Sequence, residues 1–154
     1  METTLRSSSV PVSSVYRVAS LTALVLIGFF LLMKLVNLIT VLELRFVNVL
    51  FVLYGDRYVV LHYRAEHGGN LEYLNGMMIG FMTALTTAVI FSAFIFVYLN
   101  IDSGFMHYLQ LTQPFGSYLK PSSAALVTLL EGAASGAIIS FMLMHTLNKD
   151  GDQG

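Results

Sequence analysis

The stretch NGMMIGFMTALTTAVIFSAFIFVYL, from Asn75 to Leu99, decides the fold because it contains no charged residue. About 20 consecutive apolar residues are enough for an α-helix to cross the hydrocarbon core of a bilayer. Small residues also recur at every fourth position of this stretch, and residues four apart lie on one face of a helix. We therefore predict a membrane-spanning helix with a stripe of small side chains. The stripe consists of Gly76, Gly80, Ala84, Ala88 and Ser92.

A second stripe of the same kind lies in the apolar run of residues 122–147. Helices associate in a bilayer through close van der Waals contact, because lipid tails are as apolar as leucine and burial of leucine gives no net gain. We expect the two runs to pack against each other along their stripes, which build the bundle and bind no ligand. A homodimer formed through one stripe is the alternative. The second stripe consists of Ala124, Thr128, Gly132, Gly136 and Ser140.

Two further runs precede these. Residues 16–38 follow a Ser/Thr-rich arm, residues 1–15, and carry no charge between Arg17 and Lys34. A cleaved signal peptide is the rival interpretation of this run, but no small-residue cleavage site follows its apolar part. Residues 42–62 are apolar enough to cross a membrane but hold several polar groups. These groups are Glu43, Arg45, Asn48, Asp56 and Arg57.

The overall composition indicates a membrane protein. Apolar residues make up 56% of the 154 positions and charged residues only 11%, with a mean hydropathy of +0.73. Soluble domains contain about 45–50% apolar and about 25% charged residues. We therefore predict an all-α fold, an integral membrane four-helix bundle whose spans run antiparallel, up and down. It occupies residues 16–148, with spans at about 16–38, 42–62, 75–99 and 122–147, and a polar tail follows at 149–154.

The placement of lysine and arginine predicts the orientation of this bundle, because short cytoplasmic loops carry an excess of these residues. With four spans, the larger basic group falls on the side of both termini, which are then cytoplasmic. The larger group is Arg6, Arg17, Arg57, Arg64 and Lys149, and the smaller group is Lys34, Arg45 and Lys120.

The connection between the last two spans, residues 100–121, is the longest and holds several aromatic and leucine residues with few charges. Two interpretations fit it equally. It can be an amphipathic segment in the headgroup region, with tyrosines at the interface, or an ordinary loop that covers one end of the bundle.

Glu131 is the one acid inside the last span. It lies eight residues beyond Ser123, which at about 1.5 Å per residue places it roughly 12 Å into a hydrocarbon core whose half-thickness is about 15 Å. A charge at such depth costs at least about 2.5–3.5 kcal/mol, so we expect Glu131 to face the bundle and either to pair or to stay protonated. The predicted intramembrane polar cluster consists of Glu131, Arg45, Asn48 and Lys34, with Glu43 as a further candidate.

This cluster has two interpretations. It can handle protons or cations, or bind a small polar solute, because intramembrane ionisable groups are functional candidates. It can also be an internal ion pair that fixes which helices are neighbours. A second polar zone near the opposite face is expected to be a solvated ring at the interface. Its members are Asp56, Arg57, His62, Arg64, His67 and His145.

Several function classes are disfavoured. The net charge of −1 gives no basic surface for nucleic acid, and no cysteine is present. The histidine spacing matches no zinc motif, and the sequence contains no phosphate-loop, dinucleotide or nucleophile-elbow motif. We therefore predict no catalytic residue, no cofactor and no metal site. The expected partners are membrane lipids and either a second copy of the chain or other membrane proteins.

Three stretches carry a resemblance to a known family: LELRFVN at 42–48, EYLNGMMIGFMTALTTAVIFSAFIFVYLNID at 72–102 and EGAASGAIISFMLM at 131–144. Together they resemble domain-of-unknown-function family 4199, a bacterial family of small four-helix integral membrane proteins. The resemblance implies four spans, including the second one, in the inner membrane of a bacterium. It implies no activity.

The sequence favours a non-enzymatic multi-pass membrane protein that acts as an interaction or assembly component. A small oligomeric transporter, channel or proton-coupled subunit that uses Glu131 and Arg45 is the alternative. A membrane-embedded enzyme acting on lipids is disfavoured, because His62, His67 and His145 have no evident nucleophile or metal partner.

Overall fold

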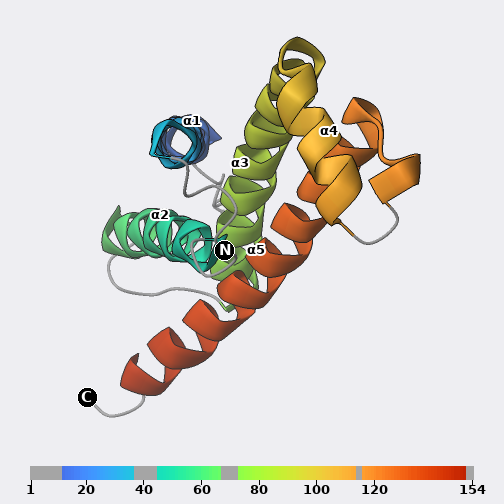
Figure 1. Cartoon of the computed structure of the whole chain (residues 1–154). Helices are drawn as coiled ribbons and strands as arrows, with labels where there is room; N and C mark the ends of the chain where they lie inside the picture. The colour runs from blue at the N-terminus through green and yellow to red at the C-terminus, as the bar shows by residue number, and fades with distance from the viewer. Residues whose placement is uncertain (1–11, 37–44, 67–72, 114–115, 152–154) are drawn as a thin grey trace, which may run out of the picture.

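The computed structural model describes residues 12–36, 45–66, 73–113 and 116–151, and all regular secondary structure in these ranges is helical (Figure 1). In chain order the elements are α1 (Val12–Leu35), α2 (Arg45–Glu66), α3 (Tyr73–Ile101), α4 (Ser103–Thr112), the short 3-10 helix η2 (Gly116–Tyr118) and α5 (Pro121–Gly151). The prediction of an all-α fold is confirmed.

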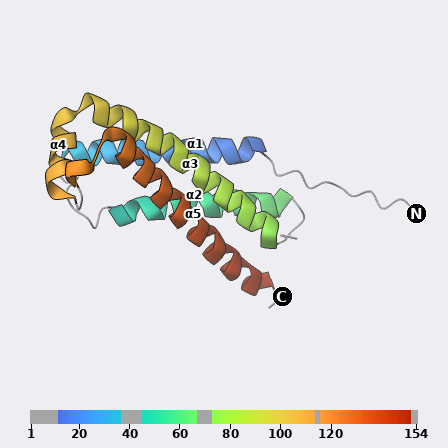
Figure 2. The same cartoon turned by 90° about the vertical axis from the view of Figure 1, so that its right-hand side faces the viewer.

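The four long helices alternate in direction along the chain (Figure 2). α1 and α2 run side by side and form one layer, while α3 and α5 cross each other in a second layer against it (Figures 1 and 2). The first residues of α1 and the last residues of α5 lie toward the same end, and α4 lies at the other end (Figure 2).

Three helices are long and apolar enough to cross a membrane: Ser13–Leu35, Tyr73–Ile101 and Pro121–Leu147. α2 has 22 residues, about 33 Å at the rise of an α-helix, which is also sufficient for a crossing. Its sequence is too polar for it to be one of the three, because Asp56 and Arg57 lie at its centre. The predicted count of four spans is therefore not confirmed.

α3 and α5 meet along the two stripes of small residues. A methyl group added at Gly132 would lie 2.6 Å from the Cβ of Ala88, and one added at Gly136 would overlap the Cβ of Ala84. One added at Gly80 would lie 2.7 Å from the Oγ of Ser140. These pairings fix an antiparallel register in which the backbones approach as closely as the glycines permit, as the stripes predict.

Hydroxyl groups bind across the helix interfaces as well. The Ser92 hydroxyl on α3 donates to the Ala125 carbonyl on α5 at 2.9 Å. The Thr87 hydroxyl donates to the Thr83 carbonyl of its own helix at 2.9 Å and is shared with the Ala19 carbonyl of α1 at 3.3 Å. Such bonds contribute about 0.6–2 kcal/mol each in membrane helices, so they add to the contact between glycines.

α2 packs on α1 and α3 through its inner face. Val59, Val60 and Tyr63 are buried in one cluster with residues from three other helices: Val15 on α1, Ile79 on α3 and Met144 on α5. Farther along α2, Gly55 allows close approach to α1, because a methyl group there would lie 2.5 Å from the Thr22 hydroxyl oxygen. α2 is thus an integral part of the bundle.

Residues 100–121, whose sequence left two interpretations open, contain α4 and η2. Asp102 ends α3 and caps α4, since its carboxylate accepts a hydrogen bond from the Phe105 amide at 2.9 Å. Aspartate is among the preferred N-cap residues because it satisfies amides that have no partner inside the helix. η2 follows α4, and α5 then begins at Pro121, where the missing N–H costs nothing.

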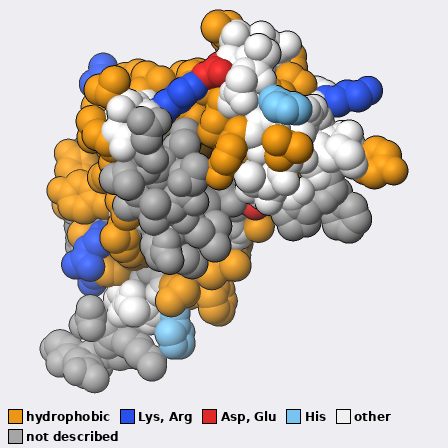
Figure 3. Space-filling model, viewed as in Figure 1, with side chains coloured by type: hydrophobic (Ala, Val, Ile, Leu, Met, Phe, Trp, Pro, Cys, Tyr) orange, Lys and Arg blue, Asp and Glu red, His pale blue; other side chains and the backbone are white. Residues whose placement is uncertain are grey.

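The outer surface of the bundle is strongly apolar. Leu24 on α1 is 63% exposed and Leu130 on α5 is 60% exposed, and many other large apolar side chains are similarly accessible. On the face seen in Figure 3, apolar side chains cover wide areas and charged side chains are few and scattered. Soluble monomers rarely expose apolar areas of this extent, so lipid is the medium that fits this surface.

Candidate functional site

The end of the bundle capped by α4 holds an ion pair inside an aromatic cluster. Lys34, in the last turn of α1, pairs with Asp102. The Tyr98 hydroxyl donates to the same carboxylate at 2.9 Å. The Lys34 ammonium also lies 4.9 Å from the ring centre of Tyr98 and 5.3 Å from that of Phe105, within the range of cation–π attraction.

Four aromatic side chains complete this cluster around Phe30, whose ring makes edge contacts with all of them. Because these rings come from α1, α3 and α4, the ion pair joins three helices at one end of the bundle. Its chemistry is that of a structural link, since Lys34 and Asp102 neutralise each other and Asp102 also caps α4. The four partners of Phe30 are Phe91, Phe94, Tyr98 and Phe105.

Asp102 was not selected from the sequence, where it is one residue of the turn NIDSG at 100–104. A polar residue of the N-cap type directly before a new helix is the signal that could have found it. Lys34 was predicted to join Glu131, and the structure instead pairs it with Asp102. The reason is local, because α4 folds back over the end of α3 and brings Asp102 to the last turn of α1.

Glu131 does not turn into the bundle interior, which corrects the expectation from its depth. Its side chain is exposed on α5. The face of α5 that meets α3 is occupied by Gly132 and Gly136, and Glu131 is rotated by about 100° from Gly132 on the helix. The Glu131 side chain therefore lies at the edge of the contact between α3 and α5 and does not point into it.

The predicted pairing of Glu131 with Arg45 stays a prediction. The side chain of Arg45 lies outside the described part of the chain, and so does residue Glu43. Asn48 is half-buried on α2, and its Oδ1 atom is buried without a hydrogen-bond partner in the described part of the chain.

Asp56 differs most from its expected place. It was assigned to a solvated ring, although the helical period also placed it, with Asn48, on the inward stripe of this span. The structure has it on the inner face of α2, and it is only 1% exposed. Its Oδ2 atom is also buried without a hydrogen-bond partner among the described residues. The close approach of Gly55 to Thr22 explains the burial, because it brings α1 directly against this part of α2.

The other members of the expected ring lie nearer the surface. Arg57, His62 and His145 are exposed, and the His62 ring stacks on Tyr58 at a centroid distance of 6.1 Å. His67 lies outside the described residues. Within the described ranges, no group of three or more His, Cys, Asp or Glu side chains is arranged to hold a metal ion.

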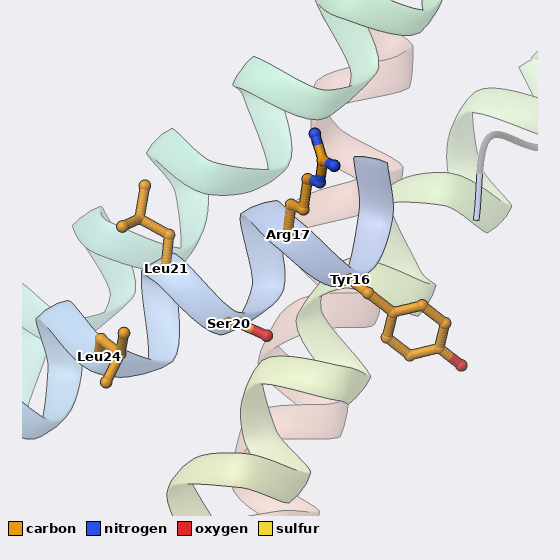
Figure 4. A pocket seen from close by; sticks show the side chains of 5 residues that line it. All are labelled: Tyr16, Arg17, Ser20, Leu21 and Leu24. Carbon is orange, nitrogen blue, oxygen red and sulfur yellow. The ribbon is translucent and has the colours of Figure 1, made fainter. Parts of the chain in front are cut away.

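A shallow, open depression lies on the surface of α1 and is lined by Tyr16, Arg17, Ser20, Leu21 and Leu24. All five side chains come from one helix and point in different directions (Figure 4). A ligand site needs polar groups that converge on one volume. This depression offers none and does not form a binding site.

No protein-family model, curated protein or solved structure matches this chain. The resemblance to family 4199 therefore stays a prediction.

Proposed function

We propose that this chain is a multi-pass protein of the bacterial inner membrane with four spans, in which α2 is the second. Both termini are then cytoplasmic. α2 supports this proposal because it is about as long as a bilayer is thick and because it packs on α1 and α3 as a regular member of the bundle.

We infer further that the protein acts through contacts with other membrane proteins or with a second copy of itself, without catalysis. The outer face of α2 carries this inference. Tyr54 is 74% exposed and Tyr58 is 55% exposed, and Arg57 lies exposed between them. An arginine near the centre of a membrane helix costs at least about 2.5–3.5 kcal/mol when it faces lipid. A protein surface that covers this face removes much of that cost.

The outer face of α1 differs from that of α2 and serves as an internal comparison. Its exposed side chains include Leu21, Leu24 and Leu32. Such a surface suits acyl chains. We therefore expect α1 to face lipid and α2 to face protein.

Photo-crosslinking in native membranes tests this assignment. A photoreactive residue is placed at Tyr54 or Tyr58 on α2 and, as a matched control, at Leu21 or Leu24 on α1. We expect protein adducts from the α2 positions and only lipid adducts from the α1 positions. An adduct of twice the chain mass identifies a homo-oligomer, and another mass identifies a different protein. Lipid adducts alone from both helices would show that the proposal is incorrect.

A further inference from the structure

The inner face of α2 carries two buried oxygen atoms without hydrogen-bond partners among the described residues, Asn48 Oδ1 and Asp56 Oδ2. They belong to residues two helical turns apart, about 12 Å along the axis. More than nine in ten buried polar groups in proteins have a partner. Two acceptors without donors on one helix therefore indicate that something besides the described side chains satisfies them.

The side chains around Asp56 offer oxygen atoms but few hydrogen-bond donors. One turn along α2, Val59 and Val60 pack against Val15 of α1 and Ile79 of α3. Asp56 therefore faces the next layer of these helices, where the buried polar residues are Thr22 on α1 and Thr83 and Thr87 on α3. The hydroxyl protons of Thr83 and Thr87 are already donated to backbone carbonyls of α3 at 2.8 and 2.9 Å.

No buried positive charge faces Asp56 in the described part of the chain. Among the described residues no lysine or arginine is buried, and Asp56 is the one buried carboxylic acid. A buried carboxylate without a counter-charge costs several kcal/mol, so the group must be neutralised. A carboxyl oxygen with hydroxyl oxygens beside it can bind a proton or coordinate an alkali metal ion.

We propose that Asp56 is the anionic centre of a site for a small monovalent cation, enclosed between α1, α2 and α3, with the Thr22 hydroxyl oxygen beside it. The cation is a proton or an alkali metal ion. This site lies on the inner face of α2, whereas the proposed protein contact uses the outer face. The two proposals are therefore independent.

Infrared spectroscopy of the purified full-length chain in nanodiscs tests the site. The spectrum of Asp56→Asn is subtracted from that of the wild type. Both proteins are measured first in a buffer whose only cation is choline, and then after NaCl or KCl is added. The difference spectrum isolates the carboxyl group of Asp56. Asp102→Asn serves as the control, because the Asp102 carboxylate is already paired with Lys34 and its difference spectrum is expected to stay the same when NaCl or KCl is added.

A protonated-carboxyl band that persists with NaCl or KCl identifies a bound proton. A carboxylate band that appears or shifts with Na⁺ or K⁺, and not with choline, identifies an alkali metal ion. A carboxylate band that is the same in all three buffers overturns the proposal. If Asp56→Asn does not fold, isotopic labelling of the aspartate carboxyl carbons in a chain with Asp102, Asp150 and Asp152 replaced by asparagine isolates the bands of Asp56, because the sequence contains four aspartates.

Discussion

Gly136 is a position where a single methyl group decides whether two helices can meet. A Cβ at this position would overlap that of Ala84, whereas one at Gly28 on α1 would have nothing within 4 Å. We expect Gly136→Ala to lower the free energy of unfolding by about 1–3 kcal/mol, the usual cost of overpacking. Gly28→Ala should leave it unchanged or raise it. Titration with a denaturing detergent, followed by circular dichroism, measures both variants.

The double variant Gly136→Ala/Ala84→Gly separates this mechanism from a general effect on the helix. It moves the methyl group from α3 to α5 and restores the space between them. Recovery of much of the lost stability is expected. Equal stability of Gly136→Ala and Gly28→Ala would contradict the close contact seen at the α3–α5 interface.

Asp102 combines two roles that substitutions can separate. Asparagine also caps helices, so Asp102→Asn removes the charge opposite Lys34 and keeps a capping side chain, at an expected cost of about 0–1 kcal/mol for a partly exposed pair. Asp102→Ala removes both and should cost about 1 kcal/mol more. Thermal unfolding in detergent measures the difference.

Lys34→Met provides the complementary control. It removes the same ion pair from the side of α1 and leaves the cap of α4 intact. We expect its stability to resemble that of Asp102→Asn. If Asp102→Ala were no less stable than Asp102→Asn, the capping role would be refuted.

At the scale of single residues, the sequence predicted the contacts of the glycines better than the positions of the charged side chains. The spacing of Gly132 and Gly136 in one helix already indicates a shared face. The partner of Lys34 and the extent to which Asp56 is buried depend on how other helices are placed around them. No pattern within one helix contains that information.

α2 is the element whose relation to the membrane decides the topology. If it crosses the bilayer, the end of α1 and the start of α3 lie on opposite sides, and if it does not, they lie on the same side. Leu35 is 80% exposed at the end of α1 and Leu74 is 62% exposed at the start of α3. Because the chain contains no cysteine, Leu35→Cys and Leu74→Cys each introduce one unique thiol.

We expect a membrane-impermeant thiol reagent to label Cys at 35 from outside the cell and Cys at 74 only after the membrane is permeabilised. Asn100→Cys and Leu74→Cys form the control pair, since these residues lie at the two ends of α3, which is long and apolar enough to cross by itself. They should always lie on opposite sides. Labelling of positions 35 and 74 from the same side would show that α2 does not cross.

The helices themselves followed from the sequence to different degrees. Residues 75–99 and 122–147 have a clear apolar pattern, and α3 and α5 contain them with one to four extra residues at each end. α4 could not be distinguished from a loop, because a short segment of mixed composition suits both. Its cap at Asp102 and its contact with the Phe30 cluster make it a helix.

At the scale of the whole molecule, lipid and protein partners compete for the outer surface. We expect the chain to migrate in mild detergent as a complex larger than one 17.0 kDa chain when α2 is intact. Arg57→Leu should change the partner contact without disturbing the fold, because this side chain is exposed. Size-exclusion chromatography with light scattering measures the mass of the protein in the complex. A monomeric wild type in native-lipid nanodiscs would leave no role for a second copy.

The sequence by itself determined the solvent of this protein and the faces along which its last two long helices meet. Both follow from short-range properties, namely the apolar composition of each run and the fixed period of the α-helix. Only the tertiary structure decided the register of α3 against α5, the pairing of Lys34 with Asp102, the exposure of Glu131 and the burial of Asp56. These depend on the rotation and depth of each helix relative to its neighbours, which is set by packing across the whole bundle.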